Sequence, residues 1–229
     1  MRVSITSGVQ FVLAVALASL ISVGLVGALW VSSGDPVPVY LVWNLFLAWV
    51  PFVLTLWLLA VLRRKTWSSW EGLAASGLWL IFLPNTFYMV SDFIHLADVD
   101  SGQLLFSAVV YTLFIALGVV LGISSLYPVH LALRRRLGPR SAGTAAVAIL
   151  GICSVAIYIG RDLRWNSWDV VADPAGVLFD LSSRLLHPGQ YGPMLAVILP
   201  FFVLLCSLYG VAWFGIQTAA GPAIYRNKR

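Results

Sequence analysis

Residues 39–65 read VYLVWNLFLAWVPFVLTLWLLAVLRRK, an uncharged stretch that ends in three basic residues. A helix needs about 20 mostly apolar residues to cross the hydrocarbon core of a bilayer, and this stretch is long enough. Backbone polar groups inside lipid must bond to one another, which favours a helix over any open structure. The stretch therefore predicts a membrane-spanning helix over residues 39–62.

Five further stretches have the same character, because each is long, apolar and free of Lys, Arg and Glu; they are residues 9–31, 72–91, 104–127, 142–160 and 193–216. None shows the short alternating segments of a membrane β-barrel. The prediction is an all-α, polytopic transmembrane bundle of six spans. Residues 16–18 (Ala-Leu-Ala) resemble a signal-peptide cleavage site, but the apolar stretch around them exceeds a signal core, so we expect a retained anchor.

The composition supports a membrane protein. Hydrophobic residues make up 60% of the 229 residues and charged residues 10%, with a mean hydropathy of +0.92, whereas soluble domains carry about 25% charged residues. Disordered and collagen-like chains are excluded on the same grounds. Cys153 and Cys206 lie in apolar runs, which excludes a disulfide scaffold.

The net charge of +5 does not indicate nucleic acid, because the basic residues form short clusters between apolar runs. Eleven of the 14 Lys and Arg residues fall on one side of the predicted membrane, and eight of the nine acidic residues fall on the other, Glu71 being the exception. The positive-inside rule then predicts a protein of the cytoplasmic membrane with both termini in the cytoplasm. Membrane lipid is the expected partner, and protein partners are left open.

The chain is expected to form a single membrane domain over residues 1–229, and its longest non-membrane segment is 161–192, on the outer side. Within it, Asp173-Pro174 resembles a helix start and His187-Pro188-Gly189 a helix end. Apolar residues cluster on one side of this segment. We therefore predict an amphipathic interfacial helix over residues 174–187, with an Asp180–Arg184 pair on its polar side.

Polar residues are concentrated in three stretches, 43–51, 83–96 and 161–169. If the second stretch is one continuous α-helix, Asn85, Tyr88, Asp92 and His95 share a stripe about 80° wide. The rise per residue puts Asn44 and Asn85 at similar depth near the outer surface, where the third stretch also emerges. The three stretches are therefore predicted to converge, with Asn44 near Asn85 and Asp92 near Arg161 or Arg164.

The second and third stretches also carry a resemblance to a known family. Leu83-Pro84-Asn85, Tyr88, Asp92 and His95-Leu96, together with Arg164-Trp165-Asn166-Ser167-Trp168-Asp169, resemble the motifs of the bacterial membrane-protein family named domain of unknown function 1361. The resemblance covers about residues 40–215. It implies a multi-pass bacterial membrane protein and carries no activity.

One functional interpretation is a membrane enzyme that acts on a lipid-linked or anionic headgroup. Asp92 and His95 would form a catalytic base–orienter pair, and the arginines beside tryptophans would grip a phosphate or carboxylate. The predicted substrate-binding residues are Asn44, Asn85, Tyr88, Arg161, Arg164, Trp165, Asn166 and Asp169.

Other interpretations remain open. Asp92 and His95, completed by His187, Asp162 or Asp169, could hold a metal ion, but a single Asp-x-x-His does not establish a metal site. The polar cluster could instead be interhelical hydrogen-bond glue in a structural or assembly protein. Prolines 51, 84 and 200 would suit the broken helices of a small-solute transporter. The sequence points to no particular cofactor, since neither a Walker loop nor a dinucleotide motif is present.

Overall fold

The structure is a computed structural model that describes residues 5–33 and 39–225. Its elements, in chain order, are α1 (Ile5–Ser33), α2 (Val39–Leu62), α3 (Trp70–Phe82), α4 (Pro84–Tyr88), η1 (Met89–Asp98, a 3₁₀ helix), α5 (Leu104–Leu137), α6 (Pro139–Asp162), α7 (Asp169–Ala172), α8 (Pro174–Leu186) and α9 (Pro188–Tyr225). The described residues contain helices and no strand.

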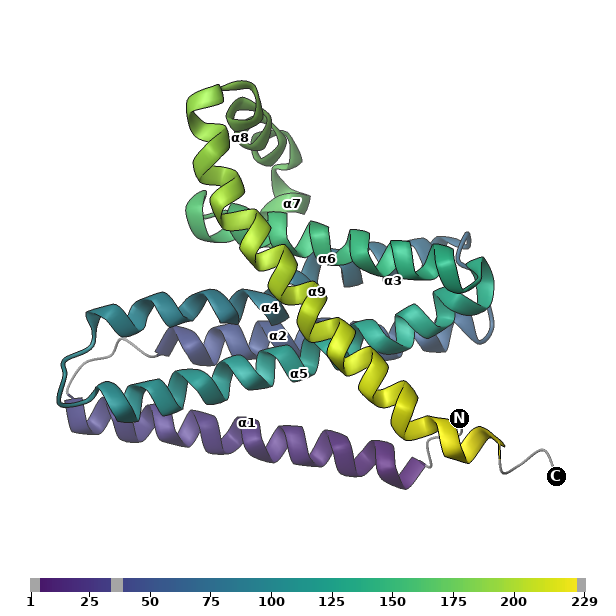
Figure 1. Ribbon diagram of the computed structural model, residues 1–229, viewed down its shortest axis with the longest axis horizontal. Coiled ribbons are helices and arrows are strands. Elements are labelled where there is room, and N and C mark those ends of the chain that lie inside the picture. The colour runs from purple at the N-terminus through teal and green to yellow at the C-terminus, as the bar shows by residue number, and fades with distance from the viewer. Residues whose placement is uncertain (1–4, 34–38, 226–229) are drawn as a thin grey trace.

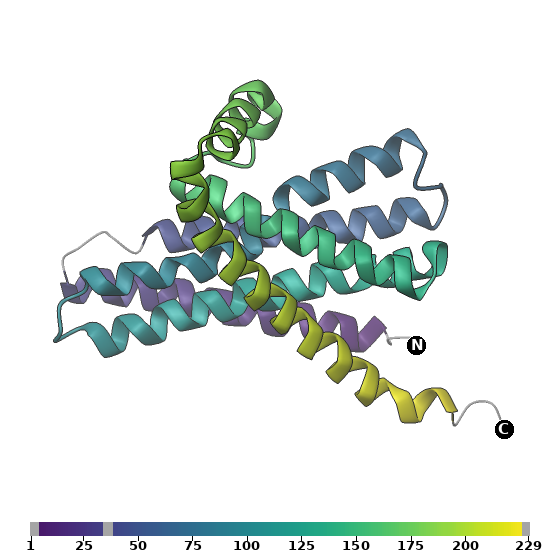
Figure 2. The same ribbon diagram turned by 45° about the horizontal axis from the view of Figure 1, so that its top comes forward.

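Six of the segments are long and apolar enough to cross a membrane: Ser7–Val31, Val39–Leu62, Trp70–Asp98, Leu104–Leu137, Pro139–Asp162 and Gly192–Ala219. The predicted six-span bundle is therefore confirmed. Five spans run side by side along the long axis, whereas α9 crosses them obliquely (Figures 1 and 2). The predicted cytoplasmic positions of the two termini fall on residues outside the described ones.

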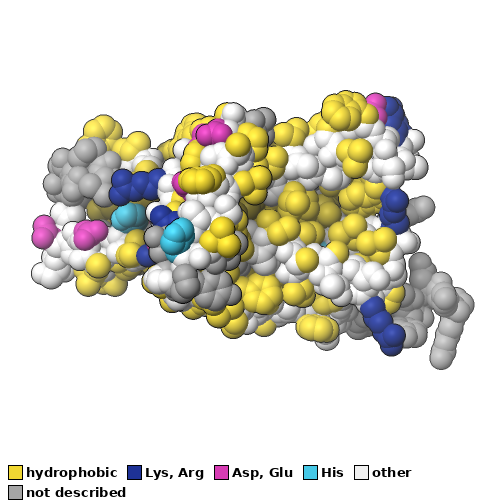
Figure 3. All heavy atoms as spheres, turned by 90° about the horizontal axis from the view of Figure 1, so that it is seen from above, with side chains coloured by type: hydrophobic (Ala, Val, Ile, Leu, Met, Phe, Trp, Pro, Cys, Tyr) yellow, Lys and Arg dark blue, Asp and Glu magenta, His cyan; other side chains and the backbone are white. Residues whose placement is uncertain are grey.

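Charged side chains gather at the two ends of the long axis, with a largely apolar band between them (Figure 3). We call the end formed by residues 63–71 and 134–140 the basic end. The opposite end, formed by η1, the 99–103 turn and residues 161–173, carries most of the described aspartates and is called the acidic end. This segregation matches the alternating pattern of charges in the sequence.

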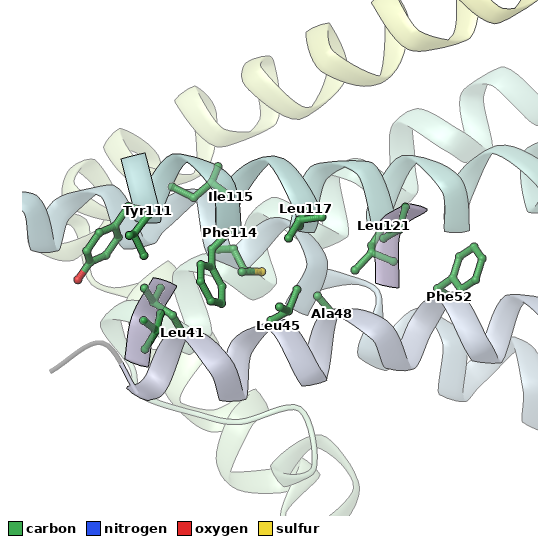
Figure 4. Packing of buried hydrophobic residues seen from close by; sticks show 13 residues of the cluster. Leu41, Leu45, Ala48, Phe52, Tyr111, Phe114, Ile115, Leu117 and Leu121 are labelled. Carbon is green, nitrogen blue, oxygen red and sulfur yellow. The ribbon is translucent and has the colours of Figure 1, made fainter. Parts of the chain in front are cut away.

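Two apolar clusters hold the bundle together. The first joins α1, α2, η1 and α5 through residues such as Leu41, Leu45 and Phe114, which point toward one another across the helix interface (Figure 4). The second joins α3, α4, α6 and α9 to α2 and α5 around Trp79, Phe87 and Leu150. Leu41, Phe87 and Phe114 are almost fully buried, as expected for side chains that fix the helix packing.

A polar network links three spans where the bundle is otherwise apolar. The Ser125 hydroxyl on α5 accepts a hydrogen bond from Trp79 Nε1 at 2.9 Å and lies 2.7 Å from the Thr55 hydroxyl of α2. Both hydroxyl oxygens also lie within hydrogen-bond distance of the Pro51 carbonyl, at 2.9 and 3.1 Å. Every buried polar side-chain atom among the described residues has a partner, so this network is closed.

The third span is not the single continuous α-helix that the sequence analysis considered. The α-helix stops at Phe82, because Pro84 has no N–H to donate to the preceding turn. A short helix follows, and from Met89 the chain winds as a 3₁₀ helix. The predicted 80° stripe is therefore wrong beyond Tyr88, because a 3₁₀ helix has 3.0 residues per turn and so rotates Asp92 and His95 relative to Asn85 and Tyr88.

Helix α8 is confirmed close to its predicted bounds, and its N-cap is Asp173, whose side chain accepts from Gly176 N at 3.0 Å. The predicted Asp180–Arg184 pair is wrong. Asp180 accepts instead from Trp165 Nε1 at 2.9 Å, and Arg184 donates to the Tyr158 hydroxyl at 3.2 Å. The two polar residues therefore face the bundle.

The outer surface of α8 is apolar. Leu178 and Phe179 are 65% and 71% exposed, and Leu186 is 78% exposed. Figures 1 and 2 show α8 standing out from the bundle beside the start of α9. An apolar surface of this kind suits the lipid boundary.

Candidate functional site

A pocket of about 180 Å³ lies near the acidic end, between α2, the α3–α4 break, α6 and the segment before α7. We call it the tryptophan–amide pocket. Its lining residues come from all three polar stretches of the sequence and from α3, α6 and α7: Trp43, Asn44, Leu47, Ile81, Pro84, Asn85, Tyr88, Ala156, Ile159, Gly160, Trp165, Asn166, Ser167, Trp168 and Val170. The predicted convergence of the three stretches is present in the structure.

The break at Pro84 positions Asn85 in this pocket. Asn85 Nδ2 donates to the Phe82 carbonyl at 3.0 Å, one of the acceptors released where α3 ends. The same nitrogen donates to Ser167 Oγ at 2.8 Å and so ties the third span to the segment after α6.

Asn44 forms a second link, behind the pocket. Its Nδ2 donates to Asp92 Oδ2 at 3.1 Å, and Asp92 is only 3% exposed. The carboxyl was expected to pair with Arg161 or Arg164, but within the described residues neither arginine forms an ion pair with it. Asn44 and Asn85 line the same pocket, as predicted.

Tyr88 packs closely against α6. A Cβ added to Gly160 would come within 3.2 Å of the Tyr88 ring, so the absence of a side chain lets the ring approach. The charged residues Arg161 and Asp162 directly follow Gly160 in α6. The pocket itself is lined by neutral groups, with these charges around it.

Aromatic rings form much of the remaining wall. Trp43 and Trp168 meet edge to face with ring centroids 6.5 Å apart, and each is about half exposed. The indole N–H of Trp165 donates a hydrogen bond to Asp180 of α8. The pocket therefore offers exposed ring faces beside amide and hydroxyl groups.

Three of the predicted binding residues lie outside this lining. Arg161 is half-buried and Arg164 exposed, and Arg164 has a left-handed backbone conformation with φ 60°, which is uncommon for a residue with a side chain. The Asp169 carboxylate accepts from the backbone N–H of Asn166 at 2.6 Å, which closes the turn that carries Asn166 and Ser167. Asp169 thus shapes the pocket wall without lining it.

His95 lies apart from the pocket. It is exposed, and its ring is 5.2 Å from that of Tyr40 on α2. The structure therefore places Asp92 against Asn44 and His95 against Tyr40. Within the described residues, no group of three His, Cys, Asp or Glu side chains is arranged to hold a metal ion.

Two contributions to the site were missed in the sequence. Ala156 and Gly160 of α6 are spaced four apart, a pattern typical of close helix contact in membranes, and it could have predicted that α6 forms one wall. The hydrogen bond from Trp165 to Asp180 could not be predicted from a local sequence pattern, because the two residues belong to separate segments.

Comparison with known proteins adds a family. The family described as "Protein of unknown function (DUF1361)" has a model that matches residues 43–208. This range contains every residue that lines the tryptophan–amide pocket. Neither the curated proteins nor the solved structures contain a match.

Proposed function

Since the chain belongs to the DUF1361 family of proteins of unknown function, which assigns no chemistry to it, we propose a function from its own geometry: the tryptophan–amide pocket binds the polar headgroup of a membrane lipid. The observation that carries the proposal is the composition of the lining. Exposed indole faces stand beside amide and hydroxyl groups in one pocket near the end of six apolar spans.

The chemistry of the lining defines the headgroup. The amide oxygens of Asn44, Asn85 and Asn166 are acceptors for hydroxyl or amide groups, and an indole face covers the apolar side of a flat or ring-shaped group. The pocket is small, about 180 Å³, below the 300–1,000 Å³ typical of sites for drug-sized ligands. It fits one headgroup moiety, with the hydrocarbon chains left in the bilayer.

The arginines extend the site toward an anion. Arg161 directly follows Gly160 and Arg164 directly precedes Trp165, and both of these neighbours line the pocket. Guanidinium groups bind phosphate through paired hydrogen bonds. In this proposal they hold the phosphate of the lipid while the pocket holds the neutral part.

The proposal concerns binding. Catalysis by Asp92 and His95 stays a prediction, because Asp92 is bonded to Asn44 and His95 packs on Tyr40. We also propose that the membrane is the cytoplasmic membrane, with the basic end in the cytoplasm and the pocket on the outer side, on the strength of the charge segregation.

Native mass spectrometry of protein purified from its own membranes tests the proposal. Trp43→Ala removes a ring from the pocket, and Trp57→Ala is the matched control, because Trp57 is also on α2, is 41% exposed and does not line the pocket. We expect the wild-type protein and the Trp57 variant to retain a bound lipid. The fraction of protein with this lipid bound should be at least about tenfold lower for the Trp43 variant. Equal lipid retention by the two variants would overturn the proposal.

A further inference from the structure

A second and larger pocket, of about 520 Å³, lies at the basic end. Its walls are the 63–67 turn after α2 and the last turns of α5. Four cationic side chains line it, two from each wall: Arg63, Lys65, Arg135 and Arg136. None of them takes part in the tryptophan–amide pocket.

The charge of this basic pocket is only partly balanced. Lys65 forms an ion pair with Glu71, and this is the one ion pair between residues that the structure describes. Arg63, Arg135 and Arg136 are exposed and form no ion pair in the part of the chain that the structure describes. Three guanidinium groups therefore surround one opening and attract an anion.

The floor of the pocket is apolar. Leu59 and Leu62 of α2 face Pro128 and Leu131 of α5, and these residues belong to two of the candidate membrane spans. A ligand that fills the pocket thus meets hydrocarbon on one side and guanidinium groups on the other. A free anion would match only the charged half.

The wall formed by the turn is held in place. Ser69 Oγ donates to the Thr66 carbonyl at 2.7 Å and accepts from Gly72 N at 3.1 Å. A Cβ added to Gly72 would come within 2.5 Å of the Thr66 carbonyl oxygen, so the turn packs directly on the start of α3. The pocket is therefore formed before any ligand arrives, which lowers the entropic cost of binding.

We propose that the basic pocket binds an anionic phospholipid, with the phosphate among Arg63, Arg135 and Arg136 and the acyl chains along the apolar floor. Basic pockets between helices at a membrane boundary suit such headgroups. This site lies at the end opposite the tryptophan–amide pocket, and it does not depend on the proposed function.

The test compares two double variants that lose the same charge. Arg135→Gln/Arg136→Gln removes two lining residues, whereas Arg64→Gln/Arg140→Gln removes two exposed arginines of the same end that do not line the pocket. Native mass spectrometry would count phosphatidylglycerol and phosphatidylcholine, with identical acyl chains, retained by detergent-purified full-length protein. We expect the wild-type and control proteins to prefer phosphatidylglycerol at least about tenfold, and the lining variant to lose that preference.

Two further arms secure the result. Arg63→Gln removes a cation from the other wall and should weaken the preference for phosphatidylglycerol over phosphatidylcholine. This single variant still tests the pocket if the double variant fails to fold. Adding glycerol phosphate at the lipid concentration should leave the bound phosphatidylglycerol in place, because the headgroup analogue has no acyl chain for the apolar floor. Displacement by glycerol phosphate, or equal lipid preference in the two double variants, would overturn the proposal.

Discussion

At the scale of single residues, the most consequential contact is between Asn44 and Asp92. The carboxyl is almost fully buried, and its side-chain hydrogen bond comes from an amide on a different span. A buried acceptor that loses its donor carries a desolvation cost without compensation. This contact therefore sets how the start of α2 packs against η1.

Asn44→Leu should lower the free energy of unfolding by about 1–3 kcal/mol, because it leaves the buried Asp92 carboxyl without its donor. Asp92→Asn should cost much less, since the new amide still accepts from Asn44. Denaturant unfolding of detergent-purified protein measures both. A loss for Asp92→Asn as large as that for Asn44→Leu would contradict this account of the pair.

The sequence predicted which residues gather at the acidic end but not which partners they choose. Asn44, Asn85, Tyr88 and Trp165 could be brought together from span boundaries and depth alone, because those depend only on hydropathy and helix rise. The partner of Asp92 could not be predicted. It depends on how far the chain rotates after Pro84, and that rotation follows from tertiary packing.

At the scale of elements, the close approach of α5 to α4 decides the packing of the third span. A Cβ added to Gly118 would lie 2.5 Å from the Thr86 carbonyl oxygen and 2.8 Å from Met89 Sδ. The first of these is backbone, which cannot rotate away. Gly118 thus gives the broken span room to lie against α5, as small residues do in membrane helix contacts.

Gly118→Ala should destabilise the fold by about 1–3 kcal/mol, the range typical of overpacking. Gly151→Ala is the matched control, because its Cβ would meet only the Phe202 ring, at an ordinary 3.7 Å. The control should be neutral or stabilising by up to about 1 kcal/mol, since alanine favours a helix more than glycine does. Parallel thermal unfolding of the two variants would distinguish these outcomes, and equal losses would argue against the close contact.

Helix boundaries were predictable from the sequence where charges end a span, as at Leu62 before Arg63. Helix boundaries were harder to predict where a helix changes type inside an apolar run. The passage from α4 to η1 has no charge or glycine to mark it, and the orientation of α8 was predicted with its polar residues paired to each other. Asp180 and Arg184 instead bond to Trp165 and Tyr158, which lie nearby only after the chain has folded.

At the scale of the whole molecule, the charges divide the protein into two ends that an apolar band separates (Figure 3). Ser68 is exposed at the basic end and Ser101 at the acidic end. The two positions therefore report on opposite sides of the bilayer.

We expect Ser101→Cys to react with a membrane-impermeant maleimide in intact cells, and Ser68→Cys to react only after the membrane is permeabilised. The background would carry Cys153→Ser and Cys206→Ser, so that the introduced thiol alone is labelled. Basic residues are retained on the cytoplasmic side, which is the reason for this expectation. Labelling of Ser68→Cys in intact cells would reverse the assigned orientation.

The oblique course of α9 has a mechanical consequence. Its apolar segment, Gly192–Ala219, has 28 residues and extends about 42 Å at 1.5 Å per residue, longer than a bilayer core of about 30 Å, and only 17% of its apolar window is buried against the protein. Such hydrophobic mismatch is relieved by tilting, so the inclination of α9 follows bilayer thickness more readily than that of the other spans. Helix α8 directly precedes α9, and Asp180 of α8 accepts a hydrogen bond from Trp165, which lines the tryptophan–amide pocket. A change in the tilt of α9 with membrane thickness would therefore move α8 and, through this hydrogen bond, Trp165.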